Sequence, residues 1–257
     1  AGGIGERAFR MITTWFLSGA LGVTGFGLYA FATTVVGIVG ALAPLGMDAG
    51  LTMYGARYRS NAEHGQLKGT LLSGLGTVAL SAPLFSILAF LAVEQGWVLA
   101  DRPTEGDALV TVCAAIGLSA VLASAVAVLI SAKDMVGQAL SSQLAVPGAT
   151  LVGAIIAVSI DAGTHGVLVA FTVAHALGAL VALHRVIRQD GTLLRTASIP
   201  AVFELKNLFA YALPQSFARI LYRANLWVDI LMLTALASLM DVGVYRVSVA
   251  IAMLGAL

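Results

Sequence analysis

Residues 108–130, ALVTVCAAIGLSAVLASAVAVLI, decide the fold class, because these 23 consecutive positions contain no charged side chain. A helix rises about 1.5 Å per residue, so a run of this length crosses the roughly 30 Å hydrocarbon core of a bilayer. Four other uncharged runs meet or approach this length: residues 26–45, 69–93, 139–160 and 166–183. An open sheet would leave unsatisfied backbone groups in lipid. The sequence therefore predicts an all-α polytopic membrane protein.

The remaining apolar segments carry charges. Residues 1–17, residues 208–236 and residues 242–257 would add two spans and the first part of another, which gives about seven and a half. Of the 257 residues only 11% are charged and 59% are hydrophobic, whereas a soluble domain carries about 25% charged residues. A water-soluble protein is therefore excluded.

The loops on the two sides of the predicted bundle differ in charge. One side carries eight basic residues: Arg57, Arg59, Lys68, Lys133, Arg185, Arg188, Arg195 and Lys206. The other side carries Arg102 among several carboxylates. Cytoplasmic loops are enriched in Lys and Arg, so the N-terminus and a connector at residues 184–206 are predicted to be cytoplasmic. Residues 54–68, which are basic and amphipathic, are expected to lie at the cytoplasmic headgroups.

The composition also excludes several classes of protein. The 14 basic and 13 acidic residues nearly cancel, so no nucleic-acid partner is expected. Cys113 is the only cysteine, and the four histidines lack the i, i+4 spacing of zinc helices, so neither a disulfide nor a metal site is expected. Without a nucleophile, a metal cluster or a nucleotide loop, the chain is not expected to be an enzyme. No cofactor is expected, apart from a coupling Na⁺ or H⁺.

A weak internal repeat divides the chain. A shift of 216 positions places residues 233–245 on residues 17–29, so that Gly243 falls on Gly27 and Tyr245 on Tyr29. Repeats of this kind are frequent in transporters. The repeat predicts a first transmembrane lobe at residues 1–183 with six spans, the first of them truncated. The connector then leads to an incomplete second lobe at residues 207–257. We expect the chain to be a fragment of a protein with about twelve spans.

Six short motifs carry a resemblance to a known family. They lie at residues 21–30 (LGVTGFGLYA), 45–50 (LGMDAG), 54–58 (YGARY), 211–214 (YALP), 225–232 (NLWVDILM) and 242–245 (VGVY). In this order they resemble the bacterial polysaccharide-biosynthesis proteins, which are the O-antigen and lipid-linked oligosaccharide flippases of the multidrug/oligosaccharidyl-lipid/polysaccharide exporter (MOP) superfamily. The chain departs from the family pattern at Asp48, where an apolar or small residue is expected.

The resemblance implies a two-lobed bundle in a bacterial inner membrane that alternates between inward-open and outward-open states. Its cargo would be a polyprenyl-diphosphate-linked oligosaccharide, moved from the cytoplasmic to the periplasmic leaflet for the synthesis of cell-surface polysaccharide such as lipopolysaccharide. Membrane lipids and glycan polymerase or ligase proteins would be its partners.

Arginines within the predicted spans mark the candidate site, because an arginine at the bilayer centre costs about 2.5–3.5 kcal/mol on insertion scales. Arg219 and Arg223 are spaced i, i+4, so they share one helix face, which Gln215 extends. Near the N-terminus, Arg7 and Arg10 also share a face. A guanidinium group binds a diphosphate bidentately and stays charged. These residues are therefore candidates for a cationic, substrate-binding cavity between the lobes.

A structural interpretation of the same charges stays open, in which they bridge the lobes or pair locally. Glu6 and Arg10 have the i, i+4 spacing of an ion pair. Arg246 is expected to pair with Asp241 or Asp229, and His175 to be a packed, hydrogen-bonded histidine. Three carboxylates are candidates for coupling to Na⁺ or H⁺: Glu6, Asp48 and Asp229.

Two other functions stay open at this point. A multidrug exporter of the same superfamily would carry mostly cationic substrates, which carboxylates would attract and cavity arginines would repel. A membrane scaffold within a glycan-assembly complex would have its charges confined to salt bridges and no water-filled cavity.

Overall fold

The computed structural model describes residues 2–97 and 103–254. Within these ranges the chain is helical and contains no strand, which confirms the all-α prediction. The helices are α1 (Gly2–Ala20), α2 (Gly22–Leu42), α3 (Met47–Ser60), α4 (His64–Glu94), α5 (Pro103–Ser131), α6 (Met135–Gln138), the π-helix η1 (Ala139–Ala145), α7 (Val146–Ser159), α8 (Gly163–Arg195), α9 (Leu205–Leu236) and α10 (Leu239–Leu254).

Five segments of the described chain are long and apolar enough to cross a membrane. They are α2, α4, α5, the continuous segment Met135–Ser159 and α8, and they coincide with the five uncharged runs of the sequence. α1 and α9 carry the arginines of the candidate site, and α9 contains only a shorter apolar stretch, Trp227–Leu236. Neither α1 nor α9 is thus identified as a span by length and composition.

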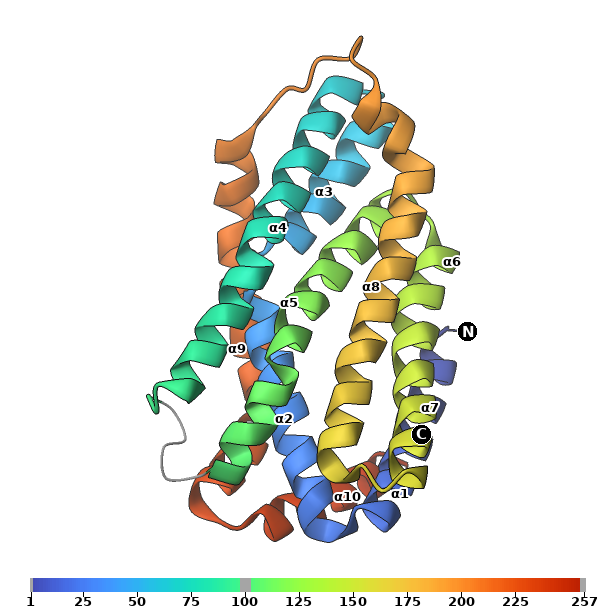
Figure 1. The fold of residues 1–257 in the computed structure, drawn as a ribbon. Coiled ribbons are helices and arrows are strands. Elements are labelled where there is room, and N and C mark those ends of the chain that lie inside the picture. The colour runs from blue at the N-terminus through green and yellow to red at the C-terminus, as the bar shows by residue number, and fades with distance from the viewer. Residues whose placement is uncertain (1, 98–102, 255–257) are drawn as a thin grey trace.

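α5 lies at the centre of the first lobe, where it contacts α2, α3, α4 and α8 (Figure 1). Small residues on α5 let its neighbours approach closely. A Cβ on Gly117 would come within 2.8 Å of the Ala82 carbonyl oxygen in α4, and the Gly117 N–H donates to the Ser86 hydroxyl at 3.0 Å. Close helix approach through small residues is the usual packing mode in lipid.

The turn at 61–63, the turn at 132–134 and the connector between α8 and α9 lie at one end of the bundle (Figure 1). We call this the basic end, because these segments and the helix ends beside them contain the eight basic residues of the cytoplasmic prediction. The opposite end holds the α1–α2, α7–α8 and α9–α10 junctions. The loops thus alternate between two ends as the charge pattern requires, and the cytoplasmic assignment of the basic end stays a prediction.

Residues 54–68, which are expected at the cytoplasmic headgroups, comprise the end of α3, the turn at 61–63 and the start of α4 at the basic end. Residues up to Ser60 belong to α3, which packs inside the bundle against α4, α5 and α9, and α4 begins at His64. Tyr58 is buried, and a Cβ on Gly55 would come within 2.8 Å of the Ser131 hydroxyl. Tyr58 and Arg59 have side-chain partners in the protein, whereas Arg57 is exposed, and the location of the segment at the headgroups stays a prediction.

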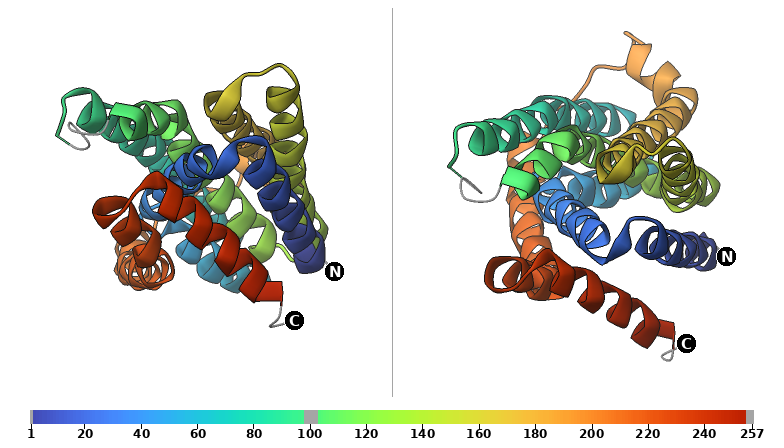
Figure 2. Two further views of the ribbon diagram at one scale, coloured as in Figure 1. Left: turned by 90° about the horizontal axis from the view of Figure 1, so that it is seen from below. Right: turned by 60° about the horizontal axis from the view of Figure 1, so that its bottom comes forward.

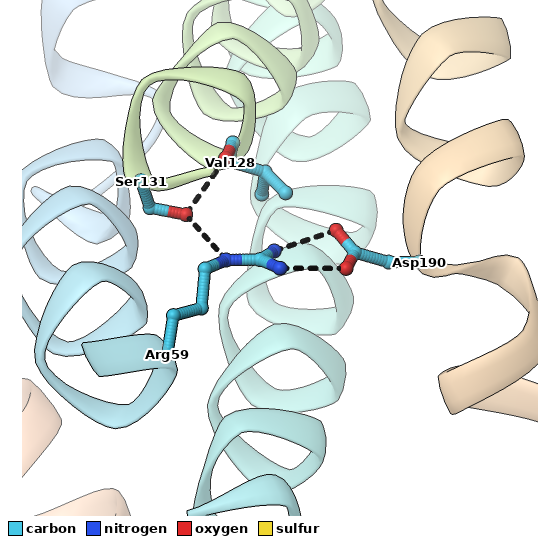
Figure 3. Close-up of polar contacts among 4 residues, drawn as sticks. All are labelled: Arg59, Val128, Ser131 and Asp190. Atoms are coloured by element: carbon cyan, nitrogen blue, oxygen red, sulfur yellow. Dashed lines mark hydrogen bonds and ion pairs between the residues drawn. The ribbon is translucent and has the colours of Figure 1, made fainter. Parts of the chain in front are cut away.

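An ion pair and a hydrogen bond of Arg59 join three helices near the basic end. The guanidinium group of Arg59 in α3 donates to both carboxylate oxygens of Asp190 in α8, at 2.9 and 2.6 Å (Figure 3). Its Nε donates to the Ser131 hydroxyl of α5 at 3.4 Å, and Ser131 donates to the Val128 carbonyl. Asp190 is buried. A bidentate fork of this kind fixes both the distance and the orientation of the helices it joins.

The predicted connector at residues 184–206 includes the last part of α8 and the first residues of α9. α8 stays helical through Arg195 and α9 begins at Leu205, so only residues 196–204 lie between the helices. The buried Lys68 of α4 donates to the carbonyl oxygens of Thr196 and Ile199, at 2.7 and 3.2 Å. The Val202 N–H donates to the Gly65 carbonyl at 3.0 Å. These bonds hold the connector against the start of α4.

The second lobe meets the first where α10 crosses α2 (Figure 2). A Cβ on Gly27 would overlap the carbonyl oxygen of Leu239, and a Cβ on Gly243 would overlap the carbonyl oxygen of Val23. A shift of 216 positions carries Gly27 to Gly243 and Val23 to Leu239. The repeat therefore exchanges the two contacts: Gly27 with Leu239 corresponds to Gly243 with Val23. The crossing is thus symmetric with respect to the repeat.

Candidate functional site: a cavity between the lobes

A cavity of about 480 Å³ lies between the two lobes. Its walls come from α1, α2, α3, α5, η1, α7 and α8 of the first lobe and from α9 and α10 of the second. Among its lining residues are three arginines, two carboxylates and one histidine: Arg10, Arg219, Arg246, Glu6, Asp48 and His175. The cavity thus contains charged groups although much of its wall is apolar, and its arginines outnumber its carboxylates.

Two of the three arginines pair with the two carboxylates. Arg10 and Glu6 form the expected i, i+4 pair at 2.9 Å, with the Arg10 side chain 71% exposed. Arg219 of α9 forms an ion pair with Asp48 of α3. Asp48, the departure from the family pattern, thus provides the partner of an arginine in the other lobe.

Arg246 is the cavity arginine that was not predicted from the sequence. Neither Asp241 nor Asp229 pairs with it, which corrects the expectation of a local ion pair. Among the described residues no carboxylate lies within ion-pairing distance of Arg246. Its neighbours at i±3 and i±4 are all apolar or glycine, and an arginine so placed in a membrane helix usually faces a cavity or a partner. That pattern was available in the sequence.

The two carboxylates near Arg246 have other partners. Asp229 accepts a hydrogen bond from the Tyr245 hydroxyl and another from the Ile230 N–H, the latter at 2.9 Å. Asp229 is not among the residues that line the cavity. Asp241 accepts from the Ser238 hydroxyl at 2.6 Å and from its N–H at 3.0 Å, at the start of α10. Both carboxylates are therefore engaged by other groups, and Asp229 acts on Arg246 only at a longer range than that of an ion pair.

Arg246 and Arg10 act on the same part of the cavity. Both interact electrostatically with Tyr29, which lines the cavity from α2, and they also interact with each other. Because Arg10 is mostly exposed and Arg246 has no paired carboxylate among the described residues, this region carries positive charge that the protein leaves partly uncompensated. An anion of two or more negative charges is the chemical group that such a region would attract.

The wall opposite the second lobe contains the π-helix η1, from which Ser142 and Gln143 line the cavity. Pro147 follows directly, at the start of α7. Proline has no N–H to donate and its ring clashes with the carbonyl four residues earlier, which here belongs to Gln143. A wider turn before Pro147 relieves that clash, and π-helical turns of this kind are frequent at functional sites.

His175 is the packed histidine that its surroundings indicated. Its Nδ1 lies 2.9 Å from the Phe171 carbonyl oxygen, and its ring lies 4.3 Å from the Phe171 ring, centroid to centroid. The ring also forms part of the cavity wall.

Two of the other predicted site residues lie outside the cavity. Arg7 and Gln215 are exposed and are not among the residues that line the cavity. Arg223 belongs to α9, but its side chain lies outside the described residues. The structure therefore brings Arg10 and Arg219 of the predicted set together with Arg246, and leaves Arg7 and Gln215 outside.

Residues 1–256 match the family model described as polysaccharide biosynthesis protein. The chain belongs to that family. No curated protein matches the chain. Among solved structures, this member of the polysaccharide biosynthesis family is similar to one described as the inward-facing conformation of a multidrug resistance MATE family transporter of the MOP superfamily, with a TM-score of 0.77 and 15% sequence identity. The match covers 97% of this chain and 58% of that transporter, and it establishes the two-lobed MOP-type fold.

Proposed function

We propose that the protein is a transporter that moves a polyprenyl-diphosphate-linked oligosaccharide from the cytoplasmic to the periplasmic leaflet of a bacterial inner membrane. Transport would proceed by alternating access between the two lobes, with the N-terminus and the basic end in the cytoplasm. This chain spans 58% of the solved transporter that it resembles, so the proposal concerns the complete protein. Glycan polymerase or ligase proteins would receive its product.

The observation that carries the proposal is the excess of arginine in the cavity. Three arginines face two carboxylates, and Arg246 has no carboxylate within ion-pairing distance among the described residues. A guanidinium group binds phosphate oxygens in a bidentate manner and keeps its charge at every physiological pH. The diphosphate of a lipid-linked sugar would supply the negative charge that Arg246 lacks.

The ion pair between the lobes suggests how a coupling ion would act. Asp48 and Arg219 come from different lobes, so Na⁺ or H⁺ at Asp48 would compete with Arg219 and loosen that contact. Glu6 lies on the same helix as its partner Arg10, and Asp229 is held by Tyr245 away from the cavity. Of the three carboxylates proposed for coupling, Asp48 is therefore the one whose occupancy would change the contact between lobes.

Two alternatives fit the cavity less well. A multidrug exporter for cations would meet electrostatic repulsion from the arginine excess. A scaffold without transport would need no cavity of about 480 Å³ between its lobes. The proposal that the protein is not an enzyme rests on its transporter-type family and fold.

Native mass spectrometry on the complete protein, purified in detergent with undecaprenyl diphosphate, tests the proposal. We expect the wild type to bind this lipid and Arg246→Gln to weaken binding by about tenfold, which corresponds to about 1.4 kcal/mol, because one charge-assisted contact is lost. Arg10→Gln should also weaken binding, by less, because its side chain is mostly exposed.

Arg7→Gln is the matched control. Arg7 lies on the same helix as Arg10, carries the same charge and is not among the cavity-lining residues, so its loss should leave binding unchanged. Equal effects of Arg7→Gln and Arg246→Gln would contradict a diphosphate site in the cavity. A wild type that binds a lipophilic cation instead of the diphosphate lipid would favour the multidrug alternative.

A further inference from the structure

A second cavity, of about 300 Å³, lies at the basic end of the first lobe. We call it the α8 pocket; its lining residues are Asp134, His184, Arg185, Arg188 and Gln189. None of them lines the cavity between the lobes. The pocket lies where the part of α8 nearest the basic end passes the turn between α5 and α6, so it is open to the surroundings of the bundle.

The charges in the α8 pocket do not balance. Asp134, its one carboxylate, accepts a hydrogen bond from the Gly137 N–H at 2.8 Å and caps α6. The same carboxylate lies 3.5 Å from the Arg185 guanidinium, a long ion pair. Arg188 is exposed, and no carboxylate among the described residues lies within ion-pairing distance of it. One carboxylate therefore faces two guanidinium groups and an imidazole.

The surface below the pocket is apolar. Val173, Leu177, Leu180, His184 and Arg188 follow one another at spacings of three or four residues, so they form one stripe along α8. The first three side chains belong to residues that are 50%, 45% and 63% exposed. From Leu177 to Arg188 the helix rises about 16 Å, which is close to half of the roughly 30 Å hydrocarbon core.

The depth of this stripe matches one leaflet of a bilayer, with apolar side chains along the acyl region and cationic groups at headgroup level. Met135 and Val136 of α6 add apolar surface beside the pocket, with exposures of 52% and 61%. Basic pockets between transmembrane helices on the cytoplasmic side typically bind anionic lipid headgroups. A soluble anion would have no use for the apolar stripe.

We infer that the α8 pocket binds the phosphate of an anionic glycerophospholipid, with Arg188 and Arg185 as its ligands and the acyl chains along the α8 stripe. The phosphate of the bound lipid neutralises the positive charge of the pocket that Asp134 alone does not neutralise. It also bridges the α5–α6 turn and α8 at the point where α8 leaves the membrane. This site is separate from the cavity between the lobes, so the inference does not depend on the proposed transport function.

Native mass spectrometry of the complete protein tests this inference, with phosphatidylglycerol as the anionic probe and phosphatidylethanolamine as the comparison. We expect phosphatidylglycerol to stay bound at a collision energy that removes phosphatidylethanolamine. Arg188→Gln should reduce phosphatidylglycerol binding by about tenfold, whereas Arg188→Lys should keep most of it. Arg188 is exposed and forms no ion pair among the described residues, so its replacement should not affect folding, which the melting temperature checks.

Arg57→Gln is the matched control, because Arg57 is an exposed arginine near the basic end that does not line the pocket. Equal losses in Arg57→Gln and Arg188→Gln would overturn the inference, because the lipid would then respond to total charge only. Equal binding of both lipids, or displacement of phosphatidylglycerol by millimolar inorganic phosphate, would also overturn it. Undecaprenyl-diphosphate binding by Arg188→Gln should stay at the wild-type level, which separates this test from that of the proposed function.

Discussion

The two ends of the interface between the lobes are held together by different kinds of contact. At the end opposite the basic end, α2 and α10 meet backbone to backbone at Gly27 and Gly243. Towards the basic end, polar side chains of α3 and α4 reach α9 and the connector. The contacts there are Asp48 with Arg219, Tyr58 with Glu204, Tyr54 with the Asn207 carbonyl, and Lys68 with the Thr196 and Ile199 carbonyls.

The difference shows which end can respond to a ligand. A contact between two backbones depends on shape alone, and a single added methyl group blocks it. An ion pair such as Asp48–Arg219 can exchange one partner for a bound ion or phosphate, because each group has an equally good partner in the ligand. We therefore expect the α2–α10 crossing to be sensitive to volume, and the polar contacts to be sensitive to charge and pH.

The largest effect is expected from Gly27→Leu. The new side chain would overlap the Leu239 carbonyl oxygen, and a backbone atom cannot move aside by changing a rotamer. Overpacking of this kind costs about 3 kcal/mol, so the melting temperature of the complete protein should fall clearly. Gly243→Leu should have a similar effect, because its Cβ would meet Val23 in the same way.

Gly76→Leu provides the matched control for the crossing. Gly76 lies in α4, and a Cβ added there would meet no atom within 4 Å, so a larger side chain would project outward without overlap. We expect its melting temperature to stay near that of the wild type. If Gly27→Leu were equally well tolerated, the crossing would not be held by shape, and the proposed contrast between the two ends would fail.

A smaller effect is expected from Asp48→Asn, which should strengthen the binding of the lipid. This change leaves Arg219 without its carboxylate and adds one positive charge to the cavity. Binding of undecaprenyl diphosphate should therefore tighten, by about 3- to 10-fold, or about 0.7–1.4 kcal/mol. The contact between lobes should loosen at the same time, which spin labels on α3 and α9 would report as a broader distance distribution.

Glu6→Gln separates these two consequences. It removes the same charge from the same cavity, but its ion pair with Arg10 lies within one helix. We expect tighter lipid binding with no change in the distance between α3 and α9. An equal change of that distance in both variants would show that the Asp48–Arg219 pair does not hold the lobes together.

The sequence predicted the spans well, because the hydrocarbon core imposes a length and an apolar composition that can be counted. It also predicted the pair Glu6–Arg10 and the packing of His175, since both depend on residues within one helix turn. It did not predict the protein partners of residues 54–68, because an amphipathic pattern does not show whether the polar face meets water or other side chains. Arg59 and Tyr58 have such partners in Asp190 and Glu204.

The composition of the cavity was predictable only in part. Arg10 and Arg219 were identified by the cost of burying charge in lipid, and the same argument applied to Arg246 would have identified it as well. The partner of Arg219 was not predictable, because Asp48 lies in the other lobe and far away in the sequence. The π-helical turn of η1 was not predictable either, since only Pro147 hints at it and most prolines in helices produce a simple bend.

The smallest effect is expected from Tyr58→Phe. The Tyr58 hydroxyl donates to Glu204 at 3.1 Å. A hydrogen bond to a charged group contributes about 1.5–3 kcal/mol, but the Glu204 carboxylate is partly exposed and screened by solvent, so only about 0.5 kcal/mol is expected. Burial, together with the Glu204 carboxylate, raises the pKa of Tyr58 to about 12. Because the folded pKa lies above the usual value of about 10, this stabilisation is fully present below pH 10 and is lost as the pH rises towards 12. We therefore measure the melting temperatures of wild type and Tyr58→Phe at pH 7 and at pH 11. The difference between the two proteins should be smaller at pH 11.

Tyr222→Phe is the control, because Tyr222 is 63% exposed, and it should match the wild type at either pH. If Tyr58→Phe lowered the melting temperature equally at both pH values, packing and not the bond to Glu204 would hold α3 near the connector.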